Sequence, residues 1–259
     1  MFEKEISQYE QLRKDYQAKI ISKMASKEWM DYNEILFSAH SCAIEGNSFT
    51  VDDTRVLHEQ GMNMIPVGRS LLECTEIADH FRAFKHIVNN LDSPFDESLL
   101  KETNRLVTAH TLPYRAPDSI AGEYTTVDMA AGDTVFGDHS ILISRVPKLM
   151  ESTQRAISDG QHPMVVAAKF HGYFEYLHPF RDGNGRTGRL MSNFILMQAG
   201  HPIVIIKLEE RDAYISALKR IRKDGTDEFL VDFFFHTAIT RMEKEIEQKA
   251  RNSKPVLFF

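Results

Sequence analysis

Residues 178–189 have the sequence HPFRDGNGRTGR and lie between two segments of helical periodicity. The first segment covers about 163–176, and the second starts near Arg186 and stops at Gly200. Gly183, Asn184 and Gly185 can adopt backbone angles that most residues avoid. The stretch therefore predicts two helices joined by a tight turn.

Successive backbone N–H groups in such a turn form a concave anion site, and the dipole of the following helix strengthens it. Arg186 and Arg189 are three residues apart, so they share a helix face behind that site. Asp182 offers hard oxygen ligands for Mg²⁺, and the His178 imidazole can accept a proton near neutral pH. These groups together predict a site for nucleotidyl or phosphoryl transfer.

Helical patterns also account for most of the remaining chain. They cover 2–24, 27–45, 70–91, 96–110, 144–158, 209–223 and 227–250. Two β-prone runs, Tyr124 to Val127 and Val135-Phe136, flank Gly132-Asp133 and predict a hairpin. We expect an all-α helical bundle with one small β-hairpin. We divide it into N-terminal helices at 1–60, a core domain at 61–245 and a tail at 246–259.

The composition narrows the class of protein. A formal net charge of -6 argues against a nucleic-acid partner, and no apolar run is long enough for a membrane helix. No secretory signal is visible, and the two cysteines, Cys42 and Cys74, are expected to be buried thiols. We expect a cytoplasmic protein with no membrane contact, and a homo-oligomer is compatible with the sequence.

The stretch 178–189 resembles the signature of the Fic family, HPFx[D/E]GNGRxxR, at every defined position. Similarity extends to the preceding helix and to Arg211-Asp212-Ala213-Tyr214, and covers about 30–245. The resemblance implies a Fic-type helical bundle with a hairpin flap. It also implies transfer of AMP from ATP to a Ser, Thr or Tyr hydroxyl of a protein, with release of pyrophosphate.

The resemblance also implies a role for each matching residue. His178 would deprotonate the target hydroxyl, and Asp182 would bind Mg²⁺ on the α- and β-phosphates. The other implied nucleotide contacts are Gly183, Asn184, Gly185, Arg186 and Arg189 for the phosphates, and Met129, Ala130, Ala131, Gly132, Tyr214 and Leu218 around the nucleoside. The flap at 122–136 would present the protein substrate by strand addition, and the chain itself is one candidate target. Thr125 departs from the family's usual arginine, which concerns target choice.

Ser41-Cys42-Ala43-Ile44-Glu45-Gly46 fits a second family pattern, [S/T]xxxE[G/N], at the end of an inhibitory helix over about 30–46. A carboxylate at a helix C-terminus opposes the helix dipole, at a cost of about 0.3–1 kcal/mol. The resemblance implies that Glu45 pairs with Arg189 and blocks the γ-phosphate, while Ser41 steadies Glu45. Three functions remain open: self-inhibited adenylyl transfer, transfer of another nucleotide or phosphate group or removal of AMP by the same fold, and nucleotide-responsive binding with vestigial activity.

Overall fold

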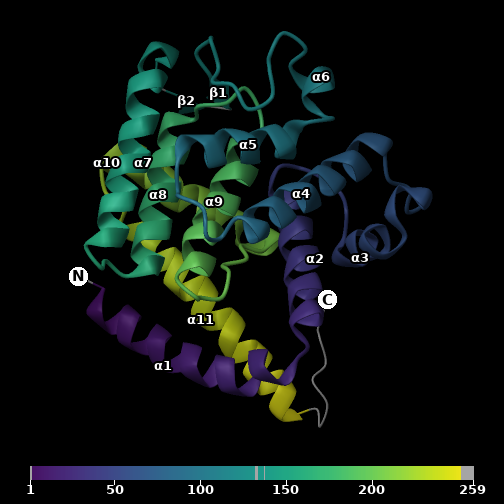
Figure 1. Ribbon diagram of the computed structural model, residues 1–259, viewed down its shortest axis with the longest axis vertical. Coiled ribbons are helices and arrows are strands. Elements are labelled where there is room, and N and C mark those ends of the chain that lie inside the picture. Colours follow the sequence, from purple (N-terminus) through teal and green to yellow (C-terminus); the bar gives the residue numbers. More distant parts are fainter. Residues whose placement is uncertain (1, 132–133, 137, 252–259) are drawn as a thin grey trace.

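The helices expected from the periodicity are present in the structure, a computed structural model that describes residues 2–131, 134–136 and 138–251 (Figure 1). The α-helices are α1 (Glu3–Lys19), α2 (Ser26–Ile44), α3 (Val51–Gln60), α4 (Leu71–Asn89), α5 (Glu97–Thr108), α6 (Leu112–Arg115), α7 (Leu142–Ser158), α8 (Pro163–Leu177), α9 (Asn184–Gln198), α10 (Arg211–Asp224) and α11 (Glu228–Arg251). Short 3₁₀ turns occupy Ile21–Lys23, Gly61–Asn63, His139–Ile141 and Leu208–Glu210. The all-α prediction is confirmed.

Helices α8 and α9 form the centre of the molecule, and the loop between them is the predicted turn. Helices α4 and α5 pack against α9, while α7, α10 and α11 pack against α8. Gly188 allows the close approach of α9, because a Cβ atom there would lie 2.7 Å from Nδ1 of His171 and 2.9 Å from Cδ1 of Phe174. Part of the central motif is therefore required by packing.

The N-terminal helices share the central core. Leu36 and Phe37 of α2 belong to the same buried cluster as Phe170 of α8 and Phe194 of α9. In Figure 1, α1 runs beside α11 at one edge of the molecule, and the two helices are in contact. Fully burying each such aromatic or aliphatic side chain contributes about 1.5–3 kcal/mol. The core therefore fixes α2, and with it Glu45, relative to α9.

Helix α3 has no counterpart among the predicted elements. Its N-cap residue is Thr50, whose side chain accepts the backbone N–H of Asp53 while the Asp53 carboxylate accepts the N–H of Thr50. Its Leu57 side chain joins a second buried cluster that includes Cys42 and Cys74. Both cysteines are free and buried, as predicted.

The predicted hairpin is wrong in extent. The strands are β1 (Ala130–Ala131) and β2 (Thr134–Val135), paired antiparallel as Ala130 with Val135 and Ala131 with Thr134. Residues 124–127 form no strand beside β2, because Tyr124 instead forms an isolated bridge with Phe180 of the central loop. A flap of the expected size is thus not seen in the described part of this segment, where two residues pair on each side.

Some predictions concern residues that the structure does not describe. Gly132 and most of the tail at 246–259 lie outside the described residues, while α11 continues through position 245 to Arg251. Within the described ranges, no helix has both the length and the apolar character needed to cross a membrane.

Candidate active site

The backbone of the central loop turns sharply at both of its ends. His178 ends α8 with φ 51° and ψ 56°, a left-handed conformation that residues other than glycine adopt infrequently. Gly183 precedes α9 with φ 77°. Between them, the Asn184 side chain accepts the N–H of Phe180 at 2.9 Å and donates to its carbonyl at 2.7 Å. Asn184 therefore holds the shape of the loop with its side chain.

Helix α5 holds the loop in place through hydrogen bonds from Asn104. The Asn104 amide donates to the carbonyl of Asp182 at 3.0 Å and to Oγ1 of Thr187 at 3.2 Å. A Cβ atom on Gly183 would lie 2.7 Å from Cγ2 of Thr108, so only glycine fits there. The loop is consequently fixed before any ligand arrives.

The N-terminus of α9 faces this loop. Its N-cap residue, Gly183, makes no side-chain cap hydrogen bond and donates its own N–H to Asp182, which leaves the N–H groups of Asn184 and Gly185 for an external acceptor. Such an end attracts anions through its N–H groups and the helix dipole. The geometry therefore suits a phosphate group at the N–H groups of Asn184 and Gly185, next to Gly183.

Two carboxylates and two arginines form a cluster beside this end of α9. Arg186 is buried and forms ion pairs with Glu76 of α4 and, at 3.1 Å, with Oδ1 of Asp182. Arg115 of α6 lies 2.9 Å from Oε1 of Glu76 and 3.3 Å from Oδ2 of Asp182. Asn47 donates to the other Glu76 oxygen at 2.8 Å. The four charges sum to zero, which offsets the cost of burying them.

Asp182 is ionised in this environment. Burial alone would raise the pKa of its carboxyl, but the Arg186 and Arg115 guanidiniums lower that pKa below its ordinary value. The Gly183 N–H also donates to Oδ1 at 2.7 Å. An ionised, partly exposed carboxylate next to an anion site fits Mg²⁺, which favours one or two carboxylates together with phosphate oxygens.

Arg189 joins α9 to the end of α2. Its Nη2 donates to Glu45 Oε1 at 2.8 Å and to the Ser41 carbonyl at 2.8 Å, and its Nε donates to Ser41 Oγ at 3.1 Å. Arg189 is 3% exposed, whereas the Glu45 side chain is 34% exposed. Arg186 and Arg189 thus share α9 but bind different partners.

His178 lies at the other side of the loop, in contact with the hairpin and α8. Its Nδ1 is 3.5 Å from Oε2 of Glu175, and its ring stacks on Phe136 with 3.7 Å between the ring centres. Burial alone would raise the pKa of Glu175, but His178 beside it lowers that pKa below its ordinary value. The Glu175 carboxylate therefore carries its negative charge directly beside the imidazole ring.

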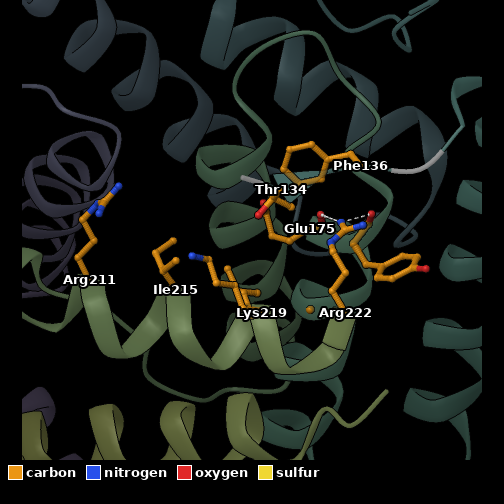
Figure 2. Close-up of a pocket in the computed structure, with 10 residues that line it drawn as sticks. Thr134, Phe136, Glu175, Arg211, Ile215, Lys219 and Arg222 are labelled. Atoms are coloured by element: carbon orange, nitrogen blue, oxygen red, sulfur yellow. Dashed lines mark hydrogen bonds between the residues drawn. The ribbon is translucent and has the colours of Figure 1, made fainter. Parts of the chain in front are cut away.

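A cavity of about 460 Å³ opens beside His178, between α8, α10 and β2. Figure 2 shows Ile215, Lys219 and Arg222 projecting from α10 towards Thr134 and Phe136. Leu218, one of the positions matched to the nucleoside, also lines it. Its walls combine apolar side chains with a few charged ones, as is usual for small-molecule sites.

Tyr214 lies in the core and is not among the residues lining this cavity. Its hydroxyl is within hydrogen-bonding distance of His171 Nε2, at 2.6 Å, and of Arg189 Nη1, at 3.4 Å. The placement of Tyr214 near the adenine stays a prediction; the next residue, Ile215, lines the cavity. The Tyr214 hydroxyl therefore helps to hold the Arg189 guanidinium in place.

Described residues of the predicted flap segment contact the central loop. Met129 accepts at its carbonyl the Phe136 N–H at 2.8 Å, and its Sδ is 3.1 Å from Nη1 of Arg181. Ala130 is exposed, and Ala131 follows it in β1. The Thr125 N–H donates to the Pro179 carbonyl at 2.8 Å, which ties the segment to the loop.

Sequence reasoning did not find Glu76, Arg115, Asn104 or Glu175. Glu76 and Asn104 lie on amphipathic helices that carry many polar residues, so these two did not stand out from the others. Glu175 lies three residues before His178, a spacing that brings side chains together on a helix, and that signal was available. Arg115 follows a proline in a short segment without periodicity, so nothing marked it.

Residues 94–196 match the Fic/DOC family, which places this part of the chain in that family. Over 192 residues it is 34% identical to a protein adenylyltransferase Fic of Nematostella vectensis, covering 70% of this chain and 42% of the relative. A relative of the same description from Drosophila grimshawi is 36% identical over 185 residues, covering 70% of this chain and 36% of the relative. The matched part therefore spans less than half the length of these curated relatives.

Solved structures share the fold. A Fic domain containing signaling protein from Bacteroides thetaiotaomicron superposes with a TM-score of 0.80 at 23% identity, covering 96% of this chain and 99% of that protein. Fic-1 from C. elegans superposes with a TM-score of 0.77 at 24% identity, covering 97% of this chain and 73% of that one. These likenesses concern the arrangement of helices, which is the predicted Fic-type bundle.

Proposed function

We propose that this protein is a self-inhibited adenylyltransferase that moves AMP from ATP to a hydroxyl group of a protein. The observation that carries the proposal is the N-terminus of α9, whose N-cap residue makes no side-chain cap hydrogen bond. Two buried arginines lie on the same helix, and His178 stacks on Phe136 of the cavity wall. The curated relatives are described as protein adenylyltransferases, which supports the same reaction.

In this proposal, the phosphates of ATP bind at Gly183, Asn184 and Gly185, with Arg186 at the β-phosphate and Arg189 at the γ-phosphate. The cavity beside Ile215 and Leu218 is large enough for a nucleoside. Mg²⁺, held by Asp182, would neutralise phosphate charge when bound. The Asn184 side chain acts indirectly, because its amide is engaged by Phe180.

The transfer step uses His178 as the base. The imidazole accepts the proton of the target hydroxyl while the hydroxyl oxygen attacks the α-phosphorus. The bond from the α-phosphorus to the bridging oxygen breaks, and that oxygen leaves with pyrophosphate. Glu175 stabilises the imidazolium formed, and the N–H groups of α9 stabilise negative charge on the phosphates. The target segment docks along the hairpin by strand addition.

Glu45 inhibits the enzyme in this scheme. Its carboxylate occupies Arg189, the group proposed for the γ-phosphate, and Ser41 helps hold the same guanidinium. A triphosphate therefore meets a negative charge where it needs a positive one. Removal of Glu45 should release Arg189 for the nucleotide.

Intact mass spectrometry tests the proposal directly. After incubation with ATP and Mg²⁺, the Glu45→Gly protein should gain one AMP group or transfer one to an added target, more than the parent protein does. The double variant Glu45→Gly/His178→Ala is the matched control and should gain none while still binding ATP. In a parallel reaction with labelled ATP, transfer of label from the γ-phosphate instead of the α-phosphate would overturn adenylyl transfer. Equal transfer by the double variant and by Glu45→Gly would overturn the role of His178 as the base.

A further inference from the structure

Asp182 has one carboxylate oxygen that is already well occupied. Oδ1 accepts the Gly183 N–H at 2.7 Å and a hydrogen bond from Nη2 of Arg186 at 3.1 Å. Both donors belong to the fixed loop and to buried α9. An incoming cation would therefore bind through the second oxygen, Oδ2.

Oδ2 faces Arg115. Nη1 of Arg115 donates to it at 3.3 Å, which is at the long end for a hydrogen bond between charged groups. A guanidinium and a divalent cation cannot share this oxygen without repulsion, because like charges at such distances disfavour each other. Binding of a metal ion at Asp182 thus requires Arg115 to withdraw.

Arg115 has a second partner that can hold it after withdrawal. The same Nη1 is 2.9 Å from Oε1 of Glu76, closer than it is to Asp182. Glu76 is buried and its other oxygen is held by Asn47, so its position is fixed. The Arg115 side chain is 33% exposed and ends a four-residue helix, which leaves it room to move. Because the ion pair with Glu76 is already formed, Arg115 keeps a counter-charge when it leaves Asp182, and the cost of moving is small.

We propose that Arg115 is a positioning residue that holds Asp182 while the metal position is free and shifts onto Glu76 when a divalent cation binds. The inference rests on the proposed role of Asp182 and adds a residue that tunes metal affinity. In the absence of metal, Arg115 keeps the Asp182 carboxylate in place and balances its negative charge. In its presence, the ion pair with Glu76 keeps the guanidinium away from the metal.

The expected effect follows from the charges. Removing the competing guanidinium should tighten Mn²⁺ binding roughly tenfold, since this partly exposed pair is screened well below its full Coulomb energy. Lysine at this position keeps the charge and should leave the affinity within about twofold of the parent. The effect concerns metal affinity and not nucleotide affinity measured without metal.

Mn²⁺ titration monitored by electron paramagnetic resonance tests this in Glu45→Gly protein saturated with α,β-methylene-ATP. The variants are Arg115→Gln, Arg115→Lys and Asp182→Asn. Arg181→Gln is the matched control, because it removes an exposed arginine next to Asp182 that contacts Met129 instead. Thermal unfolding of each variant checks that it is folded.

The outcomes separate this inference from the proposed function. Tighter Mn²⁺ binding in Arg115→Gln than in Arg181→Gln and Arg115→Lys, with weaker binding in Asp182→Asn, supports the inference. Weaker binding in Asp182→Asn but unchanged or weaker binding in Arg115→Gln overturns the role of Arg115 and leaves the metal site standing. Unchanged binding in Asp182→Asn overturns the metal assignment itself, and the role of Arg115 with it.

Discussion

Gly185 is the position where a single methyl group should separate α2 from α9. It is the second residue of α9 and has ordinary helical angles, so alanine fits its backbone. A Cβ atom there would overlap Oε1 of Glu45 and lie 2.9 Å from Nη1 of Arg189. Because the overlapped atom is at the end of a flexible side chain, Gly185→Ala should displace the Glu45 carboxylate and break its pair with Arg189.

The size of the effect depends on whether Glu45 is present. Replacing glycine by alanine in a helix stabilises by about 0.5–1 kcal/mol. Loss of the pair with Arg189 should cost about 1–3 kcal/mol, between a surface pair and a buried one, because only Arg189 is fully buried. Gly185→Ala should therefore destabilise the parent protein slightly and stabilise the Glu45→Ala protein.

Thermal unfolding of the four proteins in this cycle measures the coupling. We expect the effect of Gly185→Ala on Tm to differ between the two backgrounds by roughly 5 °C, from about 2–4 °C per kcal/mol for a protein of this size. Glu45→Gln keeps the shape of the side chain and should behave like the parent towards the added methyl group. The reasoning is refuted if Gly185→Ala lowers Tm equally with and without the Glu45 side chain.

Three further predictions concern the framework of the site. Glu76→Gln should lower the free energy of unfolding by about 3 kcal/mol in urea denaturation, because it leaves buried Arg186 short of a counter-charge, whereas Glu102→Gln on the exposed pair with Arg105 should cost less than about 1 kcal/mol. Asn184→Ala should weaken ATP binding measured by calorimetry and lower Tm, since Phe180 loses two hydrogen bonds; unchanged ATP affinity would argue against the role of Asn184 in shaping the loop. Burial lowers the pKa of His40, His171 and His201 to about 4, below the ordinary 6.5, so between pH 4 and pH 6.5 the unfolded chain binds more protons than the folded one. The contribution of these neutral histidines to the free energy of unfolding should be fully present above pH 6.5 and should be lost as the pH falls towards 4. A Tm that does not change between these pH values would contradict this prediction.

Periodicity predicted the helices because apolar residues recur at helical spacing along most of the chain. It missed α3, where the sequence Val-Asp-Asp-Thr-Arg-Val-Leu has few apolar positions and the Thr50 and Asp53 capping pair provides the main signal. The hairpin failed for a different reason. The β-prone residues Tyr124 and Thr125 form backbone contacts with Phe180 and Pro179 instead of with the other strand. Local β-propensity does not predict such long-range pairing.

The candidate site was predictable where its residues are close in sequence and not where they converge from separate helices. His178, Asp182, Arg186 and Arg189 lie within one turn and one helix, so their spacing alone brings them together. Glu76 and Arg115 come from α4 and α6, and their contacts with Arg186 and Asp182 depend on the packing of α4 and α5 against α9. The spacing of residues in a single sequence does not predict which of the distant residues form such ion pairs.

The end of α2 explains why an unfavourable glutamate can persist there. The last carbonyls of a helix lack internal partners and carry partial negative charge, to which the Glu45 carboxylate adds. Two arginines meet this charge: Arg189 donates to the Ser41 carbonyl as well as to Glu45, and Arg211 of α10 donates to the Ile44 carbonyl at 2.9 Å. Helix α2 is therefore held to α9 and α10 by the same groups that compensate the charge at its C-terminus. Any anion that binds Arg189 must weaken the contacts of Arg189 with Glu45 and with the Ser41 carbonyl at the same time. The unfavourable charge seen in the sequence is therefore, in the fold, a contact between α2 and the proposed phosphate site.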